Sequence, residues 1–182
     1  MNVEHFESTV LQSARLSLAP LRAQHAAILF EGLSNPAAYR YIPQTPPVSV
    51  AVLQSRYEKL ESRRSPDASE AWLNWALIGD DGRARGYVQA IQLAAREAWI
   101  AYFVFTPSQR QGYAKEALDA LLPVLREVYD IGRFHAEIDT RNIASIRLVE
   151  SLGFACVRRV DHADEFKGAV SDEYHYALTL SP

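Results

Sequence analysis

Residues 97–118 read EAWIAYFVFTPSQRQGYAKEAL, and this stretch decides the fold. Its first part, 97–105, is apolar at both alternating sets of positions, which is typical of a strand in the middle of a sheet covered on both faces. From Gly112 to about Tyr129 the apolar residues recur at helical spacing instead. Pro123 lies inside that pattern and predicts a kink or an early end of the helix. The apolar face of this helix comprises Ala114, Ala117, Leu118, Leu121, Leu122 and Leu125.

The residues before this stretch predict an antiparallel pair of strands. Asp80-Asp81-Gly82 supplies the left-handed conformation that a hairpin turn requires, and two runs with strand character flank it, at 71–78 and 85–93. The earlier chain is interrupted by four prolines between 36 and 47 and predicts one short strand and two helices. These lie at 15–22, 23–33 and 48–62.

The residues after the stretch alternate between strand and helix patterns. We expect a strand, a helix closed near Gly153, and two further strands, at 133–139, 142–152, 154–160 and 173–180. This mixed order predicts an α/β (α+β) sheet with helices on both faces. The chain has no internal repeat or low-complexity segment, so we expect a single domain over residues 1–182.

Composition excludes several classes of protein. Of the 182 residues, 48% are hydrophobic and 23% charged, which is typical of a globular domain. The longest apolar run, 98–105, is far shorter than the roughly 20 residues of a membrane-spanning helix. A net charge of −3 offers no basic surface for nucleic acid. The acidic amino terminus does not resemble a secretory signal, so we expect a cytoplasmic protein, with the lone Cys156 buried and unpaired.

The segment with chemical meaning is Gln109-Arg110-Gln111-Gly112-Tyr113-Ala114, between the buried strand and the helix. A turn here would direct unpaired backbone N–H groups and the positive end of the helix toward one point, where a pyrophosphate could bind. Arg110 and Lys115 could add positive charge. A glycine in this position is also typical of a simple turn, so the hexapeptide alone leaves both interpretations open.

The hexapeptide resembles the Arg/Gln-x-x-Gly-x-Gly/Ala loop with which N-acetyltransferases of the GNAT superfamily bind the pyrophosphate of coenzyme A. The run 112–117 resembles the Gly-Tyr-Ala-Thr-Glu-Ala sequence of the RimJ/RimL-like branch, the ribosomal-protein-alanine acetyltransferases. A second motif, NxxSxxLxExLGF at 142–154, resembles a segment of the same branch. The resemblance extends from about residue 10 to 180, and its specific motifs lie between 97 and 154.

This resemblance implies a mostly antiparallel sheet of six to seven strands with a V-shaped split between the fourth and fifth. It also implies acetyl-CoA as co-substrate, no metal, and direct attack of a primary amine on the thioester. The end of the fourth strand would contact the pantetheine, the loop would hold the pyrophosphate, and Asn142 would contact the pantetheine or cap its helix. The implied coenzyme-binding residues are Phe103, Val104, Phe105, Gln109, Arg110, Gln111, Gly112, Tyr113, Ala114 and Asn142.

The catalytic acid and base are less directly indicated. Many relatives place a tyrosine just before Glu-x-Leu-Gly-Phe, whereas this chain has Val149. We therefore expect Ser145, one turn earlier, to protonate the departing thiolate, as in RimL-like relatives. The glutamate that often follows Gly-Phe in those relatives is also absent, which leaves Glu97, His162 or a carboxylate of the segment 161–175 as candidate bases. Each of these could instead be a solvated surface group.

The segment 161–175 carries five acidic residues and one lysine. It is either a solvated hairpin loop or a surface that attracts a cation, so we expect a cationic amine as acceptor. Neither nucleic acid nor a membrane is an expected partner, and we expect a monomer or a homodimer. Two other functions stay open: an acyl-CoA-binding sensor without activity, and a nucleotide-binding module. The second lacks the lysine and serine of a P-loop.

Overall fold

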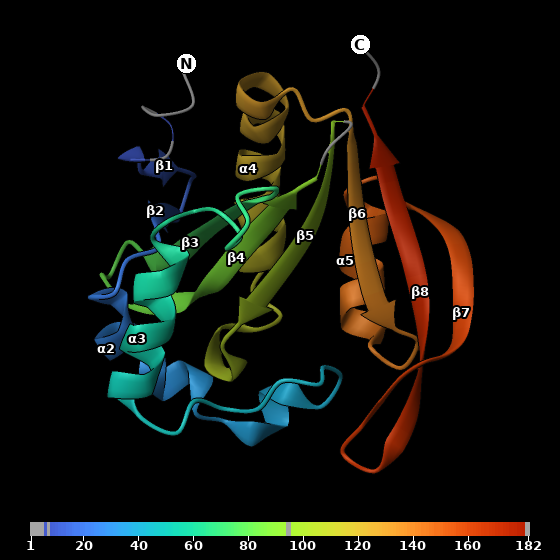
Figure 1. Cartoon of the computed structure of the whole chain (residues 1–182), viewed down its shortest axis with the longest axis horizontal. Coiled ribbons are helices and arrows are strands. Elements are labelled where there is room, and N and C mark those ends of the chain that lie inside the picture. The colour runs from blue at the N-terminus through green and yellow to red at the C-terminus, as the bar shows by residue number, and fades with distance from the viewer. Residues whose placement is uncertain (1–5, 7, 94–95, 181–182) are drawn as a thin grey trace.

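The computed structural model describes residues 6, 8–93 and 96–180, and its centre is one mixed sheet (Figure 1). In this described part, the sheet has eight strands in the order β1-β2-β3-β4-β5-β6-β8-β7. The strands are β1 Leu11–Gln12, β2 Leu16–Pro20, β3 Ala71–Gly79, β4 Ala84–Gln92, β5 Glu97–Val104, β6 Arg133–Asp139, β7 Ala155–Phe166 and β8 Ala169–Thr179. The predicted α/β class is confirmed, and the two-residue β1 extends the sheet beyond the predicted strands.

Helices cover both faces of the sheet, as predicted. The α-helices are α2 His25–Leu33, α3 Val50–Leu60, α4 Tyr113–Tyr129 and α5 Ile143–Ser151, and the short 3₁₀ helices are η1 Pro36–Tyr39 and η2 Thr106–Ser108. Helices α2 and α3 lie on one face, and α4 and α5 lie on the other (Figure 1). Helix α4 continues through Pro123 to Tyr129, where Asp130 ends it in the left-handed conformation with φ of 54°. Pro123 therefore does not shorten the helix.

The sheet splits between β5 and β6. Strand β5 pairs with β4 from Ala98 to Val104, but its parallel pairing with β6 extends only from Glu97 to Trp99. Beyond Trp99 the two strands diverge (Figure 1). The split divides the sheet into two parts, which we call the β1–β5 half and the β6–β8 half.

The two faces of β5 pack differently, because its side chains alternate. Ala98 and Ile100 pack in the core under α4, while Phe103 and Phe105 pack in the core under α2 and α3. Ala101 lies on the same face as Phe103 but is exposed. The expectation that both faces of β5 are fully covered is therefore wrong at this position.

The last two strands are longer than predicted, and most of the expected loop 161–175 is strand. A two-residue turn, Lys167-Gly168, joins them, and both residues have positive φ, 53° and 74°. This is the backbone twist that favours a tight hairpin. Strand β7 forms the edge of the sheet, so Cys156 is exposed, against the expectation of burial. None of the helices in the described residues is long and apolar enough to span a membrane.

Candidate active site

A cleft of about 400 Å³ lies at the open end of the split. Its walls come from η1, the end of β5, the loop before α4 and the start of α5. Eight of the ten predicted coenzyme-binding residues line it: Phe103, Val104, Gln109, Arg110, Gly112, Tyr113, Ala114 and Asn142. Phe105 is instead buried against Gly32 of α2, and Gln111 lies outside the lining, where its side chain donates to the Pro107 carbonyl.

The loop before α4 is shaped for an anion. Gly112 is the residue that precedes the helix, with φ of 83°, and Arg110 is also left-handed, with φ of 62°. No described residue accepts a hydrogen bond from the backbone N–H groups of residues 112–115. These amides lie at the positive end of the helix, where a phosphate group is stabilised. The geometry therefore fits the pyrophosphate of coenzyme A.

Arg15 holds this loop from the neighbouring β1–β2 segment. Its Nη2 donates to the Gln111 carbonyl at 3.0 Å, and its Nε donates to the Glu116 carboxylate at 2.7 Å. The guanidinium also lies 4.6 Å from the centre of the Tyr113 ring. An ion pair, a carbonyl and an aromatic ring thus fix the start of α4 to the β1–β5 half.

The edge of β5 beyond Trp99 has no strand partner on the side of β6. One of its acceptors is already used, because the Gln109 side chain donates to the Val104 carbonyl at 3.0 Å. This bond also ties the loop to the end of the strand. The other edge groups between Ile100 and Phe103 can pair with an extended ligand that lies in the split.

Ser145 lines the cleft from the first turn of α5. Asn142 caps this helix, and its Oδ1 accepts from the Ser145 N–H at 3.3 Å. The Ser145 hydroxyl lies 2.9 Å from the hydroxyl of Tyr102 on β5. Burial raises the pKa of Tyr102 to about 12, so the phenol stays protonated near neutral pH. Tyr102 was not predicted as a site residue, since its sequence signal is only one position in an alternating strand.

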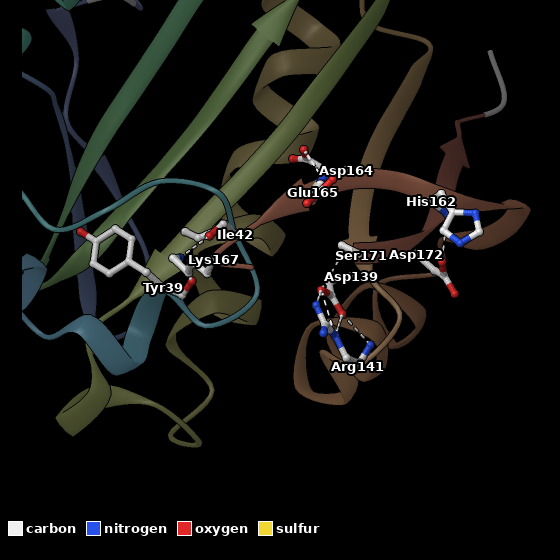
Figure 2. Close-up of polar contacts among 10 residues, drawn as sticks. All are labelled: Tyr39, Ile42, Asp139, Arg141, His162, Asp164, Glu165, Lys167, Ser171 and Asp172. Atoms are coloured by element: carbon white, nitrogen blue, oxygen red, sulfur yellow. Dashed lines mark hydrogen bonds and ion pairs between the residues drawn. The ribbon is translucent and has the colours of Figure 1, made fainter. Parts of the chain in front are cut away.

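The turn that positions α5 is built on Asp139 at the end of β6. Its buried carboxylate accepts from the Arg141 N–H at 2.8 Å and from the Ser171 hydroxyl at 2.8 Å (Figure 2). Burial alone would raise the pKa of Asp139, but the hydrogen bonds from Arg141 and Ser171 lower it overall. Asp139 therefore remains charged and holds β6, β8 and the start of α5 together.

Two of the predicted bases lie away from the cleft. Glu97 lies at the closed end of the split, where its Oε2 is 2.8 Å from His135 Nε2. It is six residues from Phe103, roughly 20 Å along the strand. His162 is exposed at an irregularity of β7, and its backbone N–H donates to Asp172 at 3.0 Å. Figure 2 shows its side chain on the far side of the hairpin from Lys167.

Other titratable groups lie together on the β6–β8 half. The pairing of β6 with β5 ends at His135, and Glu137 lies two residues further along β6. On the other side of β6, Glu137 pairs with His175 of β8. Its Oε1 is 3.4 Å from His175 Nδ1, and the Glu173 carboxylate is 3.8 Å from His175 Nε2. Arg158 also donates to His175 Nδ1, at 3.3 Å. We call Glu137, Glu173 and His175 the carboxylate–histidine cluster.

Burial and the neighbouring charges shift the pKa values of Glu173 and His175 in this cluster. Burial raises the pKa of Glu173, and the nearby charges of Glu137, Asp164 and Asp139 raise it further. Burial lowers the pKa of His175, against the opposing effect of Glu137. Sequence reasoning noted Glu173 only among the acids of 161–175 and missed Glu137 and His175. Only the register of β6 with β8 brings these residues together.

The remaining acids of 161–175 are partly neutralised. Asp161 and Asp172 both pair with Arg159, at 2.8 and 2.7 Å. At the tip of the hairpin, the Lys167 ammonium donates to the backbone carbonyls of Tyr39, Ile42 and Gln44 at 2.5, 2.6 and 3.1 Å. Figure 2 shows Lys167 reaching Tyr39 and Ile42. We call this contact the Lys167 clasp; it joins the β6–β8 half to the end of η1 and the segment after it.

Comparison with known proteins agrees with this geometry. The model of the acetyltransferase (GNAT) domain matches residues 15–155. A comparison with curated proteins gave no sequence match. Among solved structures, RimL, a ribosomal L7/L12 α-N-protein acetyltransferase in complex with coenzyme A, is 20% identical, with a TM-score of 0.83 over 94% of this chain and 98% of that chain.

Two further structures are similar. A GNAT-family acetyltransferase from Bacillus anthracis is 18% identical, with a TM-score of 0.79 over 94% of this chain and 98% of its own. A spermidine N-acetyltransferase from Vibrio cholerae, in complex with coenzyme A and spermine, is 17% identical, with a TM-score of 0.77 over 90% and 95% of the two chains. At these identities the similarity shows the fold alone.

Proposed function

Because the chain belongs to the GNAT acetyltransferase family, we propose that it transfers the acetyl group of acetyl-CoA directly to a primary amine. The observation that carries the proposal is the cleft at the split of the sheet. The free amides at the start of α4 and the hydroxyl pair of Ser145 and Tyr102 line this single cleft. An anion site and a proton donor are the two features that a departing coenzyme A thiolate requires.

The coenzyme would bind along the split. The amides of residues 112–115 and the Arg110 side chain would hold the pyrophosphate. The pantetheine would lie beside β5 between Ile100 and Val104, in the position that a neighbouring strand would otherwise occupy. An N–H group of this edge would polarise the thioester carbonyl.

In the reaction, the amine nitrogen forms a bond to the acetyl carbon, and the bond from that carbon to sulfur breaks. The sulfur leaves as a thiolate and takes a proton from the Ser145 hydroxyl. The Tyr102 hydroxyl forms a hydrogen bond with that of Ser145 and holds it in position. The hydroxyl of Ser145 regains a proton from Tyr102 or from water. Val149, at the position of the missing tyrosine, is fully buried and contributes no proton.

The amine must lose its own proton, and Glu173 is the better candidate for the base than Glu97 or His162. Glu173 belongs to the cluster on the β6–β8 half, and its pKa is raised above that of an ordinary glutamate, which favours a role as general base. Glu137 adds a second negative charge that would attract the ammonium form of the amine. The acceptor is therefore cationic at its reacting end.

The relatives act on different amines. RimL is described as an α-N-protein acetyltransferase, and the Vibrio cholerae protein as a spermidine N-acetyltransferase. For this chain, release of free thiol from acetyl-CoA should be measured with polyamines, peptides with free amino termini and amino acids. Amine-dependent release supports the proposal. Tight binding of acetyl-CoA with no release for any amine would instead indicate an acyl-CoA sensor.

A further inference from the structure

A second cavity, of about 270 Å³, lies on the α2 and α3 side of the sheet. Its floor is formed by β3 and β4, one wall by α3, and its roof by the segment 44–48. Leu21, Leu33 and Leu53 make much of it apolar. No role in coenzyme binding accounts for this cavity, because its lining and that of the cleft share no residue.

The cavity lining includes polar side chains whose donors have no acceptor among the described residues. Tyr57 is only 4% exposed, and its hydroxyl has no hydrogen-bond partner among the described residues. The same holds for the hydroxyl of Tyr87, whereas Tyr39 donates to the Leu33 carbonyl. Arg56, an exposed residue of the lining, forms no ion pair with any described residue. None of the described lining residues is acidic.

The positive charge of Arg56 reaches all three phenols. Burial raises the pKa of Tyr39 to about 12 and also raises the pKa values of Tyr57 and Tyr87, while Arg56 opposes the rise in each case. Independently of these shifts, Arg56, Tyr57 and Tyr87 all line this one largely apolar cavity. A carboxylate is the group that satisfies such donors, because it accepts several hydrogen bonds and pairs with arginine.

The cavity is a neighbour of the coenzyme cleft. Tyr87, which lines the cavity, stacks on Phe103, which lines the cleft, with ring centres 5.6 Å apart. Gln89 of the cavity pairs with Ala101 of β5, the exposed residue at the start of the split. Gln89 and Tyr87 are two residues apart on β4, so their Cα atoms are separated by roughly 7 Å along the strand.

We propose that this cavity binds a carboxylate at the far end of the acceptor, so that the acceptor is an amine that also carries a carboxylate. This inference rests on the acetyl transfer proposed above. The ammonium end lies at the carboxylate–histidine cluster beside the split, and the carboxylate end lies at Arg56 and Tyr57. The two ends of the acceptor thus contact groups of opposite charge.

Three amines of equal chain length test the inference: 5-aminopentanoate, 5-aminopentan-1-ol and 1,5-diaminopentane. They share the reacting amine and differ only in the far group. We expect the parent protein to acetylate 5-aminopentanoate with a kcat/KM about 10- to 100-fold above that of the alcohol or the diamine. Arg56→Gln and Tyr57→Phe should each reduce this preference, and Lys59→Gln, which removes a charge from the same helix outside the cavity, should not.

The outcomes separate this inference from the proposed function. Turnover that favours the diamine, or a carboxylate preference unchanged in Arg56→Gln, would overturn the inference and leave acetyl transfer intact. A protein that acetylates no amine would overturn the proposed function. In that event, calorimetry of 5-aminopentanoate with the protein saturated with coenzyme A still decides the site: binding that weakens in Arg56→Gln supports it, and no binding or equal binding refutes it.

Discussion

The hydroxyl groups of Ser145 and Tyr102 lie 2.9 Å apart across the split of the sheet, one on α5 and the other on β5. Tyr102 belongs to the β1–β5 half and Ser145 to the helix that follows β6, and the two halves of the sheet pair directly through only three residue pairs of β5 with β6. Any change in the opening of the split would therefore change this distance. The distance between these two hydroxyl groups therefore indicates whether the site is assembled.

The first prediction concerns this pair. Ser145→Ala should lower kcat by roughly ten- to a thousandfold, because the thiolate loses its proton donor, and coenzyme affinity should change little. Tyr102→Phe should have a smaller effect in the same direction. Ser151→Ala, on the exposed side of the same helix, is the matched control. An unchanged kcat in Ser145→Ala would indicate that water donates the proton.

The second prediction concerns Gly112. A Cβ atom at Gly112 would meet only Arg15 Nη2, at 3.5 Å, so Gly112→Val leaves room for folding. The positive φ of 83° nevertheless disfavours a branched residue, and the added methyl groups would obstruct the anion site. We expect calorimetry to show weaker acetyl-CoA binding. Gly82→Val, at the similar φ of 74° in a remote hairpin, should cost stability without affecting acetyl-CoA binding. Parental affinity in folded Gly112→Val would refute the pyrophosphate assignment.

The third prediction concerns pH. If Glu173 is the base, activity requires its ionised form, and its raised pKa places the acidic limb of the kcat/KM profile above the ordinary range of a glutamate. Glu137→Gln removes a like charge, so the pKa of Glu173 should fall and this limb should move to lower pH. Asp139, Asp164 and His175 also face Glu173 and must be kept unchanged in the comparison.

Removal of the base itself gives the complementary measurement. Glu173→Gln should lower kcat/KM by about 100- to 10,000-fold and abolish the acidic limb. Asp172→Asn, on the same strand but paired with Arg159, should keep the parental profile. A Glu173→Gln protein with the parental pH profile would show that the base lies elsewhere, and Glu97 would be the next residue to test.

The fourth prediction concerns the Lys167 clasp. Lys167→Met removes three hydrogen bonds to backbone carbonyls, which water can partly replace, so we expect a loss of stability of about 1 kcal/mol. Urea unfolding measures this loss. Lys167→Arg, which keeps the charge, should recover part of it. Equal midpoints for Lys167→Met and the parent would show that the contact does not stabilise the native state.

Local patterns predicted the helices and strands well, because the spacing of apolar residues within one segment is enough to distinguish a helix from a strand. The strand predicted at 133–139 is β6 without change, and the turn at Gly82 has the predicted positive φ. The motifs also placed Ser145 and Asn142 in one cleft with Gly112. The resemblance supplied the split, which no local pattern of this chain indicates.

The base and the proton network could not be predicted in the same way. Glu137 and His175 are 38 residues apart in sequence and meet only through the register of β6 with β8. Tyr102 meets Ser145 only because the sheet opens beyond Trp99. Burial of Cys156 was wrongly predicted since nothing in its local sequence indicates that β7 is the outermost strand.

The Lys167 clasp has a consequence for the shape of the acceptor. The split is bounded at one end by the three pairs of β5 with β6, and at the other by the ammonium of Lys167 on the carbonyls at the end of η1 and after it. The opening is therefore a closed loop of protein and not an open fork. We expect such a closed loop to admit a slender chain end that can be threaded through it more readily than an amine held on the surface of a bulky body.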